Sequence, residues 1–139
     1  FLVEGRPAAL QNIRTPTFAV ATEADHVAPW RSVHKLHFLT DADLVFALTS
    51  GGHNAGIVSE PGHSGRRYRI MRKEHGDAYL GPDEWFAAAP VREGSWWTAW
   101  TEWLGTHSSP GQVAPPAMGG TGGGCEPLCD APGSYVLQK

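Results

Sequence analysis

Two short apolar runs, each followed by a polar loop, constrain the fold of this chain more than any other feature of its sequence. The first run covers residues 17–21 and lies between Pro16 and a loop that carries Asp25. The second run covers residues 44–48 and leads into a glycine-rich turn that carries His53. Apolar runs of this length, with turn residues at both ends, are typical of buried strands in a parallel sheet.

The segment between the two runs has the spacing of an amphipathic helix. Pro29 fits the first helical turn, where its missing N–H group costs little. Apolar residues then recur at intervals of three and four from Trp30 to Phe38, which predicts one helix of about three turns. The order strand, helix, strand predicts a βαβ unit, and therefore an α/β fold with parallel strands and flanking helices.

The segment that follows the second loop is less regular. Over residues 57–82 no clear period emerges, and the basic cluster at residues 66–73 indicates a solvated strand or loop. A short helix is expected over residues 84–89, with Asp83 as its N-cap.

A tryptophan-rich helix is predicted over residues 96–104, with Ser95 as its N-cap. Trp96, Trp100 and Trp103 fall on one helical face, which must be buried against something. With only two convincing strands, the isolated chain is expected to leave sheet edges and this tryptophan face uncovered. It should then be poorly soluble or partly molten.

The composition changes after the tryptophan-rich helix. We expect residues 1–104 to be a segment of a catalytic domain and residues 105–139 to be a flexible Gly/Pro-rich tail. Residues 132–136 become apolar again and are expected to dock as a short extended segment. Cys125 and Cys129 lie in the tail without a second ligand pair, so a disulfide or two free thiols is favoured over zinc.

Charge and hydropathy argue against two classes of protein. The net charge of −3, from 11 basic and 14 acidic residues, offers no positive field to a phosphate backbone, so no nucleic acid is expected. No apolar run approaches the roughly 20 residues that span a bilayer. The chain also lacks an initiator Met and a signal-peptide pattern, so we expect an excised piece or a processed product, with a cytoplasmic protein as the default.

Asp25 and His53 have the placement of two members of a catalytic triad. Acyl transfer by a triad needs a nucleophile, a histidine within hydrogen-bonding reach of it, and a carboxylate that orients the histidine. In α/β-hydrolases the chain order is nucleophile, acid, histidine. The stretch between Asp25 and His53 has room for one helix and one strand. The alternative is a loop acid that caps a helix and an ordinary loop histidine.

The nucleophile itself is missing from this sequence. Neither a G-x-S-x-G elbow nor its Cys version occurs. Ser64 and Cys125 each follow a glycine by two residues, but Arg66 and Pro127 stand where the second glycine is needed. Both also come after His53, which is the wrong order. We therefore expect the nucleophile on a part of the protein outside this chain.

Three other histidines are candidates for a site. His26 adjoins Asp25 and could line the substrate pocket; the alternative is a simple loop residue. His34 and His37 have the i, i+3 spacing that can bind a metal on a helix. No convergent set of Cys or carboxylate residues supports such a site, so packing is favoured and no metal is expected.

Four segments resemble the polyhydroxyalkanoate synthases, in the order in which that family has them. Residues 22–30 resemble the acid loop, T-x-x-D-H-x-x-P-W, and residues 50–58 resemble the histidine loop, S-G-H-x-A-G-V. Residues 94–104 resemble the helix G-S-W-W-x-x-W-x-x-W-L, and residues 132–136 resemble the closing P-G-x-Y-V. The class I, short-chain type fits best. The histidine loop departs from the pattern by one extra glycine and by Asn54, where an apolar residue is usual.

The resemblance implies the C-terminal portion of an α/β-hydrolase fold and an acyltransferase. The parent enzyme would polymerise (R)-3-hydroxyacyl-CoA, such as 3-hydroxybutyryl-CoA, into polyester with release of CoA. His53 would be the general base and Asp25 would orient or assist it, while the family's nucleophilic Cys would fall before Phe1. The partners implied are the acyl-CoA and the growing polyester chain, without any cofactor beyond the CoA thioester substrate. A homodimer at the surface of cytoplasmic polymer granules is also implied.

Two other functions stay open at this point. The first is an esterase or polyester depolymerase of the same fold, which needs a Ser elbow upstream and does not need the double-Trp helix. The second is a non-catalytic interaction module, whose Trp-rich helix binds a partner or a granule surface and in which His53 is incidental.

Overall fold

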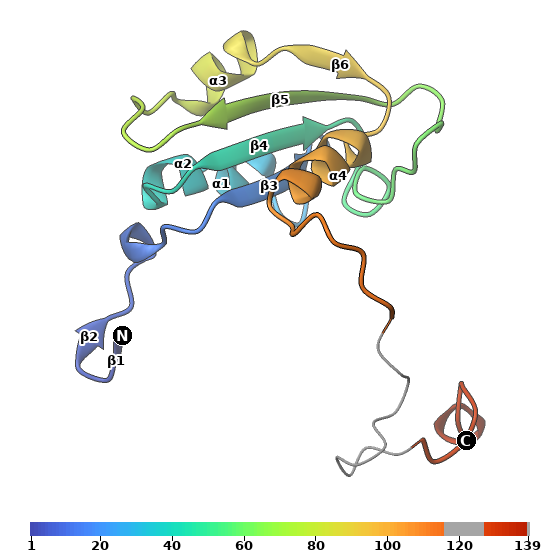
Figure 1. The fold of residues 1–139 in the computed structure, drawn as a ribbon. Helices are drawn as coiled ribbons and strands as arrows, with labels where there is room; N and C mark the ends of the chain where they lie inside the picture. Colours follow the sequence, from blue (N-terminus) through green and yellow to red (C-terminus); the bar gives the residue numbers. More distant parts are fainter. Residues whose placement is uncertain (116–126, 139) are drawn as a thin grey trace. The chain divides into compact units, whose positions relative to one another are not determined.

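The structure is a computed structural model that describes residues 1–115 and 127–138 (Figure 1). Two compact units, Phe1–Ser108 and Ser109–Lys139, are described separately. The predicted flexible tail lies partly on residues 116–126, which are outside the described residues, and so does Cys125.

The first unit is built on a four-stranded sheet in the order β3-β4-β5-β6. Its strands are β3 (Thr17–Thr22), β4 (Leu44–Thr49), β5 (Arg67–Lys73) and β6 (Val91–Glu93). β3 and β4 are parallel, as the sequence predicts, whereas β4–β5 and β5–β6 are antiparallel. The fold is therefore mixed α/β, and two antiparallel strands extend the predicted parallel pair of β3 and β4.

Strand β5 accounts for most of that difference, because arginines hide its strand pattern. Tyr68 is buried, while Arg69 is half-buried and donates a hydrogen bond to the carbonyl oxygen of Ala89 at 2.8 Å. The Arg69 guanidinium also lies over the Phe86 ring, 4.2 Å from its centroid. Long arginine stems thus cover the sheet while their charged ends reach other partners.

The helices cover both faces of the sheet. They are α1 (Trp30–Val33), α2 (Leu36–Leu39), α3 (Pro82–Ala88) and α4 (Trp97–Thr106). In Figure 1, α4 lies on one face of the sheet and α1 and α2 lie on the other. A small hairpin, β1 (Leu2–Val3) and β2 (Arg6–Pro7), and the 3₁₀ turn η1 (Leu10–Asn12) precede the sheet. The second unit contains the 3₁₀ turn η2 (Tyr135–Leu137), where an extended segment was expected.

The single helix predicted from Trp30 to Phe38 is in fact two short helices. Between α1 and α2 the backbone forms hydrogen bonds of the 3₁₀ type, from residue i to residue i−3. One of them runs from the His37 N–H to the carbonyl oxygen of His34 at 3.0 Å. In this tighter geometry, side chains at i and i+3 are eclipsed. The imidazole rings of His34 and His37 accordingly stack at a centroid distance of 4.2 Å, and both are buried.

Helix α3 begins at Pro82, two residues earlier than predicted. Gly81 is the N-cap and Pro82 opens the helix, so the assignment of Asp83 as N-cap is wrong. The Glu84 carboxylate reaches back and accepts the Gly81 N–H at 2.8 Å. This contact satisfies one of the free amides at the start of the helix.

Each face of the sheet carries its own apolar core. On the α1–α3 face the buried cluster comprises Ala21, Phe46, Leu48, Trp85 and Ala89. On the α4 face it comprises Tyr68, Trp96 and Ala99. The predicted tryptophan face is thus only partly right: Trp96 is buried, whereas Trp100 is 38% exposed.

None of the helices within residues 1–115 and 127–138 is long and apolar enough to cross a membrane.

Candidate active site

The parallel pair β3–β4 places two loops at one edge of the sheet. Thr22 and Thr49, the last residues of the two strands, are register partners. Pairing continues beyond them, because Glu23 N–H donates to the carbonyl oxygen of Thr49 at 2.9 Å and Ala24 N–H donates to that of Gly51 at 3.0 Å. The acid loop and the histidine loop are therefore held side by side at their roots.

This arrangement brings Asp25 and His53 into direct contact. Asp25 Oδ2 lies 2.9 Å from Nδ1 of His53. The other carboxylate oxygen of Asp25 accepts the N–H groups of Val27 at 2.8 Å and Ala28 at 2.9 Å. The Asp25 side chain is only 9% exposed. Three hydrogen bonds thus fix the orientation of this carboxylate.

The same hydrogen bonds keep Asp25 ionised. The Ala28 N–H, followed by the His53 side chain, lowers the pKa of Asp25 to about 2. An ionised carboxylate can only accept hydrogen bonds, so Nδ1 of His53 must be the donor. In the neutral imidazole the proton then sits on Nδ1, and Nε2 keeps the lone pair that a general base needs. The His53 side chain is 46% exposed, which leaves it accessible to a reacting group.

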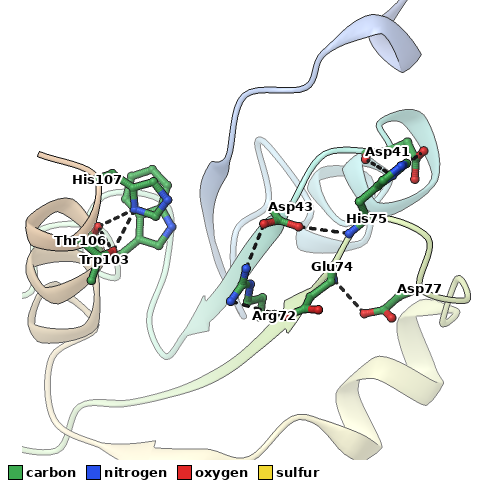
Figure 2. Close-up of polar contacts among 9 residues, drawn as sticks. All are labelled: Asp41, Asp43, Arg72, Glu74, His75, Asp77, Trp103, Thr106 and His107. Carbon is green, nitrogen blue, oxygen red and sulfur yellow. Dashed lines mark hydrogen bonds and ion pairs between the residues drawn. The ribbon is translucent and has the colours of Figure 1, made fainter.

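Two other acid–histidine pairs among the described residues show that distance alone does not define this site. Glu60 lies 3.0 Å from His63, and Asp41 lies 2.8 Å from His75. Figure 2 shows His75 held by Asp41 and by the neighbouring Asp43. The acids of these pairs are 59% and 44% exposed, respectively. Asp25 differs because its carboxylate is nearly buried and sits at the carboxyl end of a parallel strand.

The turn before His53 has little steric freedom. Gly51 adopts φ +111°, a conformation that favours glycine. A Cβ atom on Gly56 would lie 2.5 Å from Cγ2 of Thr22, so the far end of the loop packs tightly against the end of β3. The end of β3, which leads to Asp25, therefore also packs against the loop that carries His53 and restricts its position.

A salt bridge adds a further tie that sequence reasoning missed. Glu23 in the acid loop accepts a hydrogen bond from Arg67 at 3.0 Å, which joins this loop to β5. In the sequence, only the basic cluster at residues 66–73 indicates that salt bridges form here. It does not indicate which acidic residue each arginine contacts.

The remaining candidate residues are placed apart from this pair. His26 is exposed beside Asp25. His34 and His37 are buried in the core, which confirms the packing interpretation. Cys129 is exposed in the second unit. Across the described part of the chain, no group of three or more His, Cys, Asp or Glu residues is arranged to hold a metal.

Two hollows flank the α1–α3 face. One of about 250 Å³ adjoins the acid loop and is lined by Glu23, Trp30, Arg31 and Phe86. A second of about 280 Å³ lies by the end of β5 and is lined in part by His37, Lys73 and Trp85. Only the first includes a residue of the loops that form the site, and His26 lines neither.

Fold and site together define a mixed α/β protein that presents a carboxylate–imidazole pair at the carboxyl ends of two parallel strands. No protein-family model matches the chain. Individual proteins do: the chain is 34% identical over 135 residues to poly(3-hydroxyalkanoate) polymerase 2 of Ectopseudomonas oleovorans, which covers 97% of this chain and 23% of that protein.

Two further polymerases match over nearly the same length. The chain is 33% identical over 136 residues to poly(3-hydroxyalkanoate) polymerase subunit PhaC of Cupriavidus necator, with 97% of this chain and 22% of that protein covered. It is 31% identical over 138 residues to the PhaC subunit of Rhizobium etli, with 99% and 21% covered. The chain is therefore related in sequence to the poly(3-hydroxyalkanoate) polymerases, which confirms the resemblance that the motifs indicate. It spans about a fifth of the length of these curated relatives.

Proposed function

We propose that this chain supplies the carboxylate and the imidazole of the catalytic triad of a polyhydroxyalkanoate synthase. The observation that carries the proposal is the contact between Asp25 and His53, 2.9 Å long, within a chain related to the polymerases. The relatives' names specify poly(3-hydroxyalkanoate) as the polymer. The substrate class would be (R)-3-hydroxyacyl-CoA, with the short-chain 3-hydroxybutyryl-CoA favoured by the class I motifs.

The chemistry requires a thiolate nucleophile from outside this chain. The thiolate attacks the thioester carbonyl, the carbon–sulfur bond to CoA breaks, and CoA leaves as the thiol after taking up a proton. The acyl group is then held as a thioester on the enzyme. No cofactor is needed, because the CoA thioester itself carries the activated acyl group.

His53 has a role in the elongation step. A hydroxyl group of a 3-hydroxyacyl unit attacks the enzyme-bound thioester, an ester bond forms, and the enzyme thiolate is released. Nε2 of His53 accepts the hydroxyl proton and passes it to the departing thiolate, so that the charges balance. Asp25 holds the Nδ1–H tautomer and stabilises the imidazolium that forms transiently. His26, beside Asp25, would contact the substrate and would take no part in proton transfer.

Several features of the whole protein belong to the same proposal. The two parallel strands and their loops would be the last part of an α/β-hydrolase fold, whose upstream part carries the nucleophile. The whole enzyme would be a homodimer that works at the surface of cytoplasmic polymer granules. The exposed pair Trp100 and Leu104, each 38% exposed on α4, would be covered in that assembly.

Replacing His53 in the intact polymerase tests the proposal. His53→Ala should lower CoA release from 3-hydroxybutyryl-CoA by at least about a hundredfold, because the base is lost. The matched control is His75→Ala, which removes an imidazole that lies 2.8 Å from Asp41. This variant should release CoA at a rate within about twofold of the parent enzyme. Undiminished polymer formation by His53→Ala would overturn the role of His53 and favour the interaction-module alternative.

A further inference from the structure

Two tryptophans at the start of α4 donate hydrogen bonds to the loop that carries His53. The Nε1–H of Trp96 donates to the carbonyl oxygen of Gly56 at 3.2 Å, and the Nε1–H of Trp97 donates to that of Ile57 at 2.9 Å. Trp96 is buried and Trp97 half-buried, so the first bond is buried and the second is partly buried. The paired indoles therefore do more than fill space, because a phenyl ring could pack there but could not donate.

Ser95, the residue before this pair, extends the contact. Its hydroxyl donates to the carbonyl oxygen of Ser59 and accepts the backbone N–H of Trp97 at 3.0 Å. Ser95 is 5% exposed and Ser59 is fully buried. Three consecutive side chains thus bond to three carbonyl groups within residues 56–59.

The helix that makes these contacts is itself fixed to the strand that leads to Asp25. The ring of Phe18 in β3 stacks on Trp96 at a centroid distance of 6.1 Å and meets Trp103 edge-on at 5.8 Å. Asp25 is the third residue after the end of β3, so its position is set by the backbone of that strand. The same strand also positions His53 indirectly. Phe18 of β3 packs against α4, and the side chains at the start of α4 bond to the loop that carries His53.

We propose that Ser95, Trp96 and Trp97 form a clamp that positions His53 against Asp25. They are positioning residues, since they act on the imidazole through the backbone of residues 56–59. The catalytic consequence of the clamp rests on the proposed function, whereas its effect on the loop does not. The clamp gives the G-S-W-W segment a role that amphipathic packing does not require.

The test uses the intact polymerase with Trp97→Phe and Trp96→Phe, compared with Trp100→Phe. Trp100 lies on the same helix, and no hydrogen bond from it to the His53 loop occurs among the described residues. Hydrogen–deuterium exchange of residues 52–59 should rise in Trp97→Phe and Trp96→Phe and stay at the parent level in Trp100→Phe. In the two test variants kcat should fall by about tenfold to a hundredfold with KM little changed, because a misplaced base affects the chemical step.

The possible results separate the clamp from the proposed function. If exchange and kcat in both test variants equal those of Trp100→Phe, the clamp is overturned while the role of His53 stands. If exchange rises but neither these variants nor His53→Ala lose activity, the clamp holds the loop and the proposed function fails. Melting of each variant is measured alongside. Should Trp96→Phe unfold, the partly exposed Trp97 and the substitution Ser95→Ala still provide the comparison, and a loop unchanged in both would refute the clamp.

Discussion

The Asp25 carboxylate accepts hydrogen bonds from His53, Val27 and Ala28, and its pKa of about 2 keeps it charged throughout the neutral range. Replacing it by Asn keeps the shape but removes the charge, and it allows the amide NH₂ to face Nδ1 of His53. The proton of the imidazole then moves to Nε2, where it blocks the base. We expect Asp25→Asn to lower the CoA-release rate of the intact polymerase by about a hundredfold to ten-thousandfold.

Asp41→Asn is the matched control for this substitution. Asp41 forms the same kind of pair with His75, at 2.8 Å, but on a carboxylate that is 44% exposed. Its replacement should change the rate by less than about twofold, since exposed ion pairs contribute little. Equal losses in the two variants would mean that the effect of Asp25→Asn is general destabilisation and not the loss of an oriented base.

At this scale the sequence predicts which residues form the candidate site better than it predicts the contacts that hold them in position. The motif around Asp25 and the glycine turn before His53 were sufficient to pair the two side chains. The fit of Gly56 against Thr22 was not predictable, because it depends on a distance between two loops that only the register of β3 and β4 sets.

Helices α1 and α2 pack on the sheet through two buried histidines, which makes this contact sensitive to acid. Burial, followed by the charges of His37 and Arg31, lowers the pKa of His34 from 6.5 to about 4. Burial also lowers the pKa of His37. The unfolded chain therefore binds more protons than the folded chain between pH 6.5 and about 4. Stability should be full above this window and fall as the pH drops through it.

His34→Phe should reduce this acid sensitivity. The side chain is 1% exposed and lies edge-on to Phe46 and Trp85, at centroid distances of 5.6 and 5.8 Å, so a phenyl ring suits the site. On acidification from about pH 7 to about pH 5, the thermal midpoint of the intact polymerase should drop by roughly 2–4 °C less in the variant than in the parent. His75→Gln, which removes an exposed imidazole, should behave like the parent. A variant with the full parental drop would show that His34 does not control the acid response.

The sequence predicts a helix or strand well where a single hydrophobic pattern fits its residues, and poorly where two patterns fit the same residues. The apolar runs predict β3 and β4 almost to the residue, because helices pack on both faces of these two strands. The break between α1 and α2 was missed because apolar periodicity does not distinguish an α-helix from two turns joined by 3₁₀ geometry. The apolar pattern does not distinguish β5 from a loop, because Arg67, Arg69 and Arg72 count as polar residues although arginine stems can pack as apolar surface.

For the molecule as a whole, the structure changes the reason to expect poor solubility of the isolated chain. The tryptophan helix is largely docked, with Trp96 buried against the sheet, so it does not expose a complete face. The open features are the outer edges of β3 and β6, since both strands are at the ends of the sheet order. Strand β3 has six residues and β6 only three, so β3 offers the longer edge for pairing with another chain segment.

The last expectation is that the chain alone carries out no acyl transfer, because the proposed triad takes its acid, Asp25, and its base, His53, from this chain but not its nucleophile. Neither a G-x-S-x-G nor a G-x-C-x-G segment occurs in the sequence, and Cys129 is exposed in the second unit. Purified chain incubated with 3-hydroxybutyryl-CoA should release CoA thiol at the background rate, while the intact polymerase releases it rapidly under the same conditions. Release by the chain that disappears in His53→Ala would mean that a nucleophile within these 139 residues works with His53. The substitutions Cys125→Ser and Cys129→Ser would then identify whether it is either thiol. A background rate in the chain, together with loss of activity in the intact His53→Ala enzyme, is the result expected for a triad whose nucleophile comes from elsewhere in the protein.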